Sequence, residues 1–226
     1  MKLLDLKGKI PDEQFTVLST EISELRPAQE KSINAGLLEN NNLLVCTPTA
    51  SGKTLIAELA ALKKILRSHE KVIYIAPLKA LANEKFKNFK KRYGKLAKIA
   101  MSIGDIDSAD PYLQNYDLII TTPEKLDSLI RHHSPWLRDI GLVIIDEIHL
   151  LNDSSRGPTL EIILTILKSV LKGVQILGLS ATIGNPQELG DWLDAKVVED
   201  NWRPVDLHKG VYLEGEIEFI KKKKKN

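Results

Sequence analysis

The chain has almost no cysteine, no closely spaced metal ligands and no long hydrophobic run, and each shortage excludes a class of protein. Cys46 is the only cysteine in 226 residues, so a disulfide-stabilised scaffold is excluded. Only His132 and His133 lie close together, which leaves no ligand spacing for zinc. No run approaches the roughly 18 apolar residues of a membrane span, and the charged N-terminal segment does not resemble a signal peptide. We therefore expect a cytoplasmic protein that makes no membrane contact.

A strong net charge is also missing. The chain has 32 Lys and Arg against 30 Asp and Glu, which gives a formal charge of +2. Five of the lysines are consecutive, residues 221–225, so the rest of the chain carries 27 basic and 30 acidic residues and a charge of −3. Proteins that coat nucleic acid through charge alone are strongly basic, so any nucleic-acid contact must be local.

Short apolar runs alternate along the chain with segments of helical period. The runs are continuously apolar, which is typical of strands buried on both faces of a parallel sheet. Between them, hydrophobic residues recur at helical spacing over residues 55–66 and 160–171. Repeated strand–helix–strand units predict an α/β fold, a mostly parallel sheet with helices on both faces. The predicted strands are residues 43–46, 72–76, 99–103, 118–120, 142–145 and 176–179.

The segment from Cys46 to Thr54 joins the first predicted strand to a helix. A tight turn of small residues at that point presents backbone N–H groups and a helix N-terminus to an anion. Lys53 could reach the β- and γ-phosphates of a nucleotide, and the Thr54 hydroxyl could ligate Mg²⁺. Thr47 stands where the strict P-loop pattern has its first glycine. The alternative is an ordinary turn, but a lysine in the first helical turn is unfavourable unless an anion neutralises it.

Two adjacent carboxylates, Asp146 and Glu147, follow the predicted strand 142–145. Ligand sites in open α/β sheets form at the carboxyl ends of the strands. Asp146 could hold Mg²⁺, and Glu147 could orient the attacking water. The alternative is a helix N-cap followed by a first-turn acid. A zinc peptidase is disfavoured, because the H-E-x-x-H order is absent.

Six blocks, in order along the chain, resemble the motifs of superfamily 2 helicases. The residues Asp146-Glu147-Ile148-His149 resemble the DExH box, and Pro48 to Thr54 resemble motif I with its first glycine replaced. The other blocks are Arg26 to Gln29, similar to the Q-type motif; Pro77 to Leu81, similar to motif Ia; Thr121 to Lys125, similar to motif Ib; and Ser180 to Thr182, similar to motif III. The resemblance covers about residues 23–213 and is strongest to the Ski-like group, in particular its archaeal DNA-repair members.

The resemblance implies a role for each matched residue, with ATP and Mg²⁺ as cofactors. Catalysis would fall to Lys53, Asp146 and Glu147, and Mg²⁺ would bind Thr54 and Asp146. The nucleotide would contact Gln29 (at the adenine edge), Thr49, Ala50, Ser51, Gly52, Lys53 and Thr54. Nucleic acid would contact Pro77, Lys79, Gly104, Asp105, Thr121, Thr122 and Pro123. His149, Ser180 and Thr182 would couple the nucleotide state to the grip on nucleic acid.

Simpler readings remain open for some of these residues. The segment 121–124 is also a good helix start, the segment 180–182 a plain strand end, and His149 could simply pack. The pair His132-His133 is interpreted as a solvated helix end. The basic cluster between Lys85 and Lys98, which includes Arg92, is interpreted as a solvated helix face, with nucleic-acid contact as the alternative.

The resemblance also implies a domain organisation. A single RecA-like P-loop domain is expected over residues 26–205, after an N-terminal extension (1–25) and before a linker and lysine-rich tail (206–226). Superfamily 2 helicases use two RecA-like domains, and nothing after Trp202 resembles motifs IV to VI. We therefore expect one half of a motor, completed by a second RecA-like domain in cis or in trans and nearly inactive without it.

The leading interpretation is the N-terminal motor domain of an ATP-dependent DNA helicase, monomeric, acting on single-stranded or forked DNA in repair or fork processing. An RNA helicase of the same group is the first alternative. A nucleotide-switched adaptor without turnover is a second, although it would need no water-positioning Glu147. A P-loop metabolic kinase is a third, but the chain lacks an arginine-rich lid and the other blocks would be unexplained.

Overall fold

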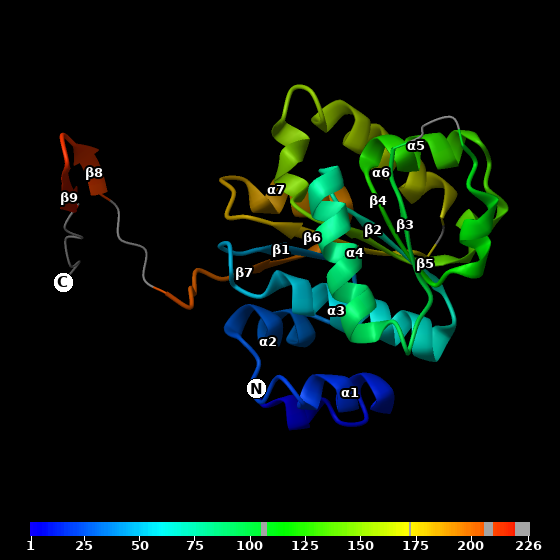
Figure 1. Ribbon diagram of the computed structural model, residues 1–226, viewed down its shortest axis with the longest axis horizontal. Coiled ribbons are helices and arrows are strands. Elements are labelled where there is room, and N and C mark those ends of the chain that lie inside the picture. The colour runs from blue at the N-terminus through cyan, green and yellow to red at the C-terminus, as the bar shows by residue number, and fades with distance from the viewer. Residues whose placement is uncertain (105–107, 172, 206–209, 220–226) are drawn as a thin grey trace.

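A computed structural model of the chain describes residues 1–104, 108–171, 173–205 and 210–219. Within these ranges a seven-stranded parallel sheet is flanked by helices (Figure 1), which confirms the predicted α/β fold. The strand order is β3-β4-β2-β5-β6-β1-β7. The strands are β1 (Leu43–Cys46), β2 (Lys71–Ile75), β3 (Ile99–Ser102), β4 (Leu118–Thr121), β5 (Ile140–Ile145), β6 (Gln175–Ser180) and β7 (Lys196–Glu199).

Two hydrophobic clusters pack on the two faces of the sheet. One face is covered by the N-terminal segment and α1 to α4, and the other by α5 to α7. Alternate residues of β5 point into different clusters, Leu142 and Ile144 into the first and Val143 and Ile145 into the second. The helices are α1 (Asp12–Ser19), α2 (Pro27–Asn34), α3 (Lys53–Lys63), α4 (Lys79–Tyr93), α5 (Pro123–Arg131), α6 (Gly157–Val170) and α7 (Pro186–Leu193). No helix in the described ranges is both long and apolar enough to cross a bilayer.

Residues 1–25 share a hydrophobic core with the rest of the domain. Leu6, Ile10 and Leu18 are fully buried in the cluster that also contains α3 and α4. The side-chain amide of Gln14 donates to the carbonyl of Glu58 at 3.0 Å. This segment therefore covers one face of the sheet and supports the helices that lie there.

Two details of the fold differ from the sequence-based expectation. β7 lies at the edge of the sheet beside β1, and only Val198 among its residues is buried, so it has no continuous apolar run to reveal it. Val170 belongs to the apolar stripe predicted on α6, but its side chain is exposed because the helix ends there. After Trp202 the described residues include an antiparallel hairpin of β8 (Gly210–Leu213) and β9 (Glu216–Phe219).

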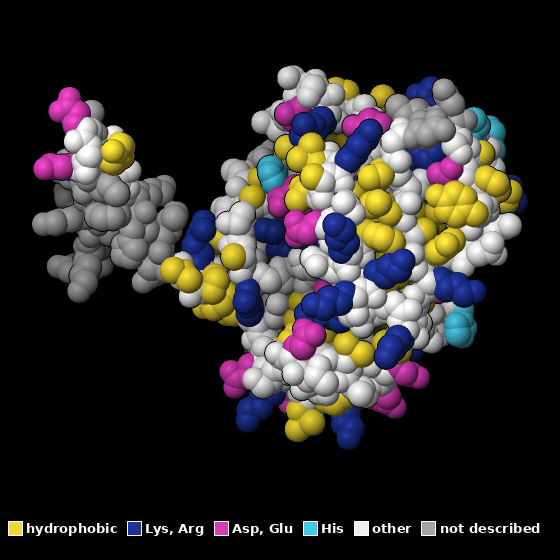
Figure 2. Space-filling model, viewed as in Figure 1, with side chains coloured by type: hydrophobic (Ala, Val, Ile, Leu, Met, Phe, Trp, Pro, Cys, Tyr) yellow, Lys and Arg dark blue, Asp and Glu magenta, His cyan; other side chains and the backbone are white. Residues whose placement is uncertain are grey.

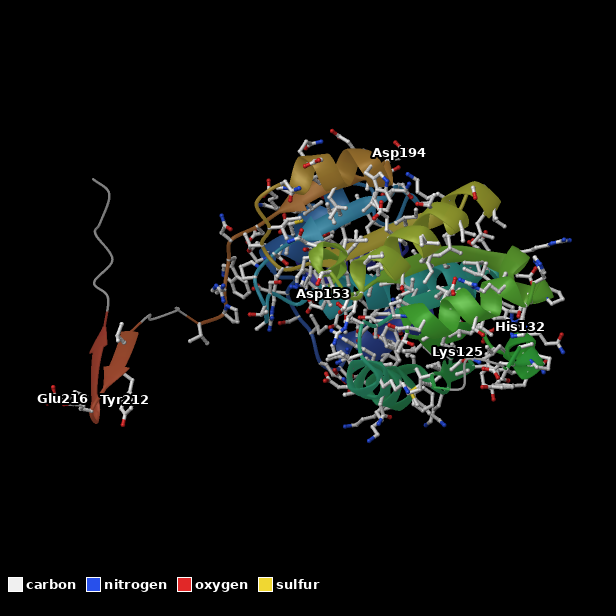
Figure 3. All side chains as sticks on the ribbon, turned by 90° about the horizontal axis from the view of Figure 1, so that it is seen from above. Lys125, His132, Asp153, Asp194, Tyr212 and Glu216 are labelled. Carbon is white, nitrogen blue, oxygen red and sulfur yellow. The ribbon has the colours of Figure 1, made fainter. Side chains whose placement is uncertain are left out.

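The hairpin lies apart from the main sheet in both views, and Figure 3 labels Tyr212 and Glu216 on it (Figures 1 and 3). Tyr212 is 70% exposed and Val211 is also exposed. A two-stranded hairpin alone in water is marginally stable.

A buried acid on α3 fixes the position of α4. Glu58 is only 3% exposed, and its carboxylate accepts hydrogen bonds from Arg92 at 2.7 Å and from the Tyr93 hydroxyl at 2.8 Å. Burial raises the pKa of Glu58, and the Arg92 charge opposes that rise. Arg92 also pairs with Glu21, whose side chain is 50% exposed. The interpretation of Arg92 as part of a solvated face is therefore wrong.

The substitution Glu58→Ala should destabilise the fold by about 3 kcal/mol, because it leaves Arg92 and the Tyr93 hydroxyl without their buried partner. Glu21→Ala removes the exposed partner of the same arginine and is expected to cost about 0–1 kcal/mol. Urea unfolding of both variants measures the difference. Equal losses for the two variants would show that burial of Glu58 has no special importance.

Candidate functional site

The turn between β1 and α3 is shaped to hold an anion. Gly52 has φ +95°, and a Cβ at this position would lie 2.3 Å from the side-chain nitrogen of Gln29, so the turn requires glycine. Ala50 is also left-handed, at φ +63°. The N-terminus of α3 has neither a side-chain cap nor an acidic residue in its first turn. Its free N–H groups and helix dipole therefore favour a bound anion.

The Lys53 side chain folds back over this turn. Its ammonium donates to the carbonyl oxygens of Thr47 at 2.9 Å and Pro48 at 3.3 Å. Burial lowers the pKa of Lys53, and the charges of Glu147 and Asp146 oppose that effect. The side chain of Ser51 is hydrogen-bonded to that of Thr47 at 2.7 Å, which closes the turn from within. The ammonium thus lies where an incoming phosphate could accept its hydrogen bonds.

The Arg26–Gln29 block holds the outer side of the same turn. The Gln29 amide accepts from the Arg26 backbone N–H at 2.8 Å and donates to the Gly52 carbonyl at 3.0 Å. The Arg26 guanidinium donates to the Ala50 carbonyl at 2.5 Å and lies 5.6 Å from the Trp202 ring centre. Contact of Gln29 with an adenine edge stays a prediction, since both ends of its amide are engaged here with the protein.

Asp146 and Glu147 follow β5, as predicted, and their side chains have different surroundings. Asp146 is 7% exposed; it accepts from the Tyr74 hydroxyl at 2.7 Å and from the Glu147 N–H at 3.1 Å. Burial raises the pKa of Tyr74 well above its usual range, so the phenol stays a neutral donor. Glu147 is half-buried and left-handed at φ +51°, a conformation that costs about 1–3 kcal/mol in a residue other than glycine.

Lys85 of α4 is a site residue that the sequence interpretation missed. Its ammonium donates to the Thr54 hydroxyl at 3.0 Å and lies 3.3 Å from Oδ2 of Asp146. The interpretation of Lys85 as part of a solvated helix face is therefore wrong. Figure 2 does show Lys and Arg side chains at the surface over α4. The signal that could have revealed it is spacing, because Lys85, Phe89 and Tyr93 occur at every fourth position of one helix.

His149 lies between Glu147 and the end of β6. Its Nδ1 is 3.4 Å from Oε2 of Glu147 and 3.5 Å from the Ala181 N–H. A bare Nδ1 can accept from Ala181, and a protonated one can donate to Glu147, so the two contacts exclude each other. The carbonyl of buried Ser180 accepts from the Thr47 N–H at 3.2 Å. The coupling role of His149, Ser180 and Thr182 stays a prediction, and Thr182 is exposed.

The residues predicted to contact nucleic acid differ in accessibility. Lys79 is exposed at the start of α4, and Pro77 and Gly104 are half-buried. The side chains of Thr121 and Thr122, and Pro123, are buried. Nucleic-acid contact by Thr121, Thr122 and Pro123 stays a prediction. Because their side chains are buried in this conformation, such contact would be restricted to backbone groups. Asp105 lies outside the described residues.

A polar cluster holds the loop before β4 against α5. Lys125 of α5, labelled in Figure 3, is almost fully buried; it lies 3.2 Å from Oδ2 of Asp110 and donates to the Ser108 carbonyl at 2.7 Å. Asp110 also accepts from the Ser102 hydroxyl at 2.6 Å. The cluster therefore ties the segment after β3 to the helix that follows β4.

Strand order separates the two groups of predicted residues. The segments that follow β1, β6 and β5 contain the phosphate turn, Ser180 to Thr182, and the acidic pair. Those that follow β2, β4 and β3 contain the residues predicted to bind nucleic acid. Because all seven strands are parallel, both groups lie at the same edge of the sheet.

The residues present fit a nucleotide and a divalent metal. The turn at Gly52 is a cradle that a Cβ would fill, and Lys53 supplies a cation there. Thr54 and Asp146 offer the oxygen ligands that Mg²⁺ prefers, and an ammonium already lies between them. No cluster of three His, Cys, Asp or Glu able to hold a metal occurs among the described residues.

Comparison with known proteins places this geometry in a family. Residues 26–189 match the DEAD/DEAH box helicase family. The ATP-dependent DNA helicase Hel308 of Methanococcus vannielii is 54% identical over 206 residues, and that of Pyrococcus abyssi is 55% identical over 196 residues. These alignments cover 88% and 86% of this chain and 27% of each relative, so the chain spans about a quarter of their length.

A solved structure is also similar. The crystal structure of the DUF1998 helicase MrfA bound to DNA has a TM-score of 0.72 and 27% sequence identity, and the match covers 85% of this chain and 30% of that one. The family match extends from the Arg26–Gln29 block past the acidic pair to α7. By its sequence, its fold and the arrangement of its phosphate turn and acidic pair, the chain belongs to the DEAD/DEAH box helicase family.

Proposed function

We propose that this chain is the N-terminal, ATP-binding motor domain of a DNA helicase. The observation that carries the proposal is the strand order. Lys53 and Thr54 follow β1, Asp146 and Glu147 follow β5, and the single strand β6 lies between these two strands. ATP and Mg²⁺ are the proposed cofactors. The Hel308 relatives are named ATP-dependent DNA helicases, which favours DNA over RNA as the substrate.

The proposed mechanism begins with the phosphates at the turn before α3. The free N–H groups of α3 and the Lys53 ammonium bind their negative charge. Thr54 and Asp146 would hold Mg²⁺, which when bound neutralises charge that develops on the phosphates. Tyr74 fixes the Asp146 carboxylate through its hydroxyl. Glu147 is not one of the proposed metal ligands. Its carboxylate orients the attacking water and accepts its proton.

A cavity of about 400 Å³ beside the turn is proposed for the adenine ring. It lies between the N-terminal segment, α2 and α3 and reaches the back of the phosphate turn. Gln29 lies in its wall, so a rearranged amide could reach the base edge. The lining residues are Glu21, Ile22, Ser23, Glu24, Arg26, Gln29, Gly52, Leu55 and Arg92.

Single-stranded or forked DNA is proposed to cross the ends of β2, β4 and β3. Lys79 provides an exposed cation there, and backbone groups near Gly104 and Thr122 provide further contacts. Such binding needs only a few charges, so an overall charge of −3 outside the lysine run is compatible with it. DNA repair or fork processing is the proposed setting.

A second RecA-like domain, in cis or in trans, is proposed to complete the motor. The proposed RecA-like domain covers residues 26–205, supported by the packed segment 1–25, and residues 206–226 would start the connection. Residues 206–209 and the lysine run lie outside the described ranges. We propose a monomeric protein that works in the cytoplasm.

Binding to a 3′-tailed DNA fork and to the matching RNA tests the substrate. With a non-hydrolysable ATP analogue present, fluorescence anisotropy is expected to show tighter binding of the DNA. Tighter binding of the RNA would support the alternative of an RNA helicase. Absence of ATP-analogue binding by the chain would contradict the proposed function itself.

In the same assay, Lys79→Ala should weaken DNA binding to a similar extent for every sequence. Loss of one phosphate contact is expected to reduce the slope of log affinity against log salt by about 0.7–1. Lys9→Ala removes an exposed lysine of the N-terminal segment and serves as the control. An unchanged slope for Lys79→Ala would place the strand elsewhere.

A further inference from the structure

The ammonium of Lys85 lies between the two residues proposed to bind the metal. It donates to the Thr54 hydroxyl at 3.0 Å and pairs with Oδ2 of Asp146 at 3.3 Å. The side chain is 14% exposed, far less than expected of an ordinary surface lysine. It also lies 5.9 Å from the centre of the Tyr74 ring, over the aromatic face whose hydroxyl binds the same carboxylate.

The position of Lys85 is set by packing along α4. Phe89, one turn further on, packs edge-on against Tyr74 with ring centres 5.7 Å apart, and Tyr93 follows at 6.0 Å from Phe89. Tyr93 binds Glu58, which lies one turn after Thr54 on α3. Two matched contacts, Lys85 with Thr54 and Tyr93 with Glu58, therefore fix the register between the two helices.

Lys85 also balances the charge of Asp146. The carboxylate is nearly buried, and its other donors, the Tyr74 hydroxyl and the Glu147 N–H, are neutral groups. The Lys53 ammonium is hydrogen-bonded to the carbonyls of Thr47 and Pro48, and its interaction with Asp146 is one of charge without a direct ion pair. A buried carboxylate without a paired cation is strongly unfavourable, so the ion pair stabilises the metal-free site.

We propose that Lys85 is a positioning residue that holds Thr54 and Asp146 in place when no metal is bound, and that the divalent metal must displace its ammonium. This inference rests on the proposed function, because it takes Thr54 and Asp146 as the metal ligands. An ammonium offers only donors, so it occupies the same oxygen lone pairs that a metal would need. Two cations within a few ångströms of one carboxylate also repel each other.

Two properties follow from this exchange. The protein alone binds a divalent metal weakly, because the metal competes with a cation that is already part of the fold. Metal binding becomes favourable when nucleotide phosphates add further ligands and offer the displaced ammonium new acceptors. After one nucleotide leaves and before the next binds, the Lys85 contacts therefore hold Thr54 and Asp146 in position without a bound metal.

The test measures Mn²⁺ binding to the nucleotide-free chain by electron paramagnetic resonance. Lys85→Gln keeps a donor for the Thr54 hydroxyl but removes the charge, and it is expected to bind Mn²⁺ about tenfold more tightly than the parent. Lys85→Arg keeps the charge and should bind Mn²⁺ as weakly as the parent. Lys91→Gln removes an exposed lysine of the same helix and should change nothing.

Thermal unfolding gives a second readout that does not depend on activity. In EDTA, Lys85→Gln should lower the Tm by about 4–8 °C, and Mg²⁺ should restore much of that loss while leaving the parent Tm unchanged. Equal Mn²⁺ affinities, or a lower Tm that Mg²⁺ does not restore, would reduce Lys85 to a packing role and overturn the inference.

A fluorescent ATP analogue, added with Mg²⁺ to the same samples, separates the two proposals. If the parent binds no analogue, the proposed function fails. If the parent binds it but Lys85→Gln leaves Mn²⁺ affinity and the metal dependence of Tm unchanged, only the inference about Lys85 fails.

Discussion

The 226-residue chain, assayed alone, should hydrolyse ATP about 10³- to 10⁵-fold more slowly than the same chain joined to a second RecA-like domain. That factor is the typical contribution of an arginine finger, which in a two-domain motor comes from the opposite domain. Arg26 lies near the phosphate turn here, but it is held at the back by the Ala50 carbonyl and the Trp202 ring. Lys53 and Lys85 therefore supply the positive charge of this half-site.

A coupled ATPase assay with single-stranded DNA measures the difference. The second domain can be fused to the chain or added in trans, with an arginine-to-alanine variant of that domain as the control. The rate should rise only with the intact second domain. A DNA-stimulated rate of several turnovers per second from the chain alone would show that this half of the motor is sufficient.

The second large effect is expected for Glu147→Gln in the two-domain form. Removing a group that orients water and accepts its proton should lower the turnover rate about 10²- to 10⁴-fold. Binding of ATP should persist, because the hydrogen bond and ion pair of Glu147 join it to Asp146 and His149, and its influence on Lys53 is one of charge alone, while the amide is isosteric. Stopped-flow binding of a fluorescent ATP analogue and steady-state turnover separate the two effects.

The exposed Glu13 of α1 offers a matched control, since Glu13→Gln makes the same chemical change far from the sheet edge. A loss of analogue binding in Glu147→Gln equal to the loss in turnover would assign Glu147 to nucleotide binding. A small effect on turnover would show that another residue orients the water.

The sequence predicted the sheet and the main site because both follow from local pattern. Strands buried on both faces have continuous apolar runs, and the parallel order places the residues after each run at one edge. Asp146 and Glu147 directly follow such a run, and Lys53 and Thr54 follow one within eight residues. Their proximity thus needed no knowledge of how the helices pack.

The features that were missed depend on packing between distant segments. Lys85 stands in a helix rich in lysine, and its partners Thr54 and Asp146 come from α3 and the end of β5. Thr121 and Thr122 are buried, which limits their predicted DNA contacts to backbone groups. The loop before β4 is held in place by the ion pair of Lys125 with Asp110. The spacing of Lys85, Phe89 and Tyr93 marks one face of α4, but nothing at short range in the sequence identifies the distant partners in either arrangement.

The division of the sheet edge has a consequence for how such motors can diversify. The segments after β3 and β4 contain none of the residues proposed to bind the nucleotide, whereas the segment after β2 contains Lys85, which contacts Thr54 and Asp146. The two groups meet at the seam where β2 pairs with β5, and Tyr74 of β2 binds Asp146 there. Insertions after β3 or β4 could therefore give a new nucleic-acid preference to an unchanged ATP site, provided that the contacts of Tyr74 and Lys85 with Asp146 are kept.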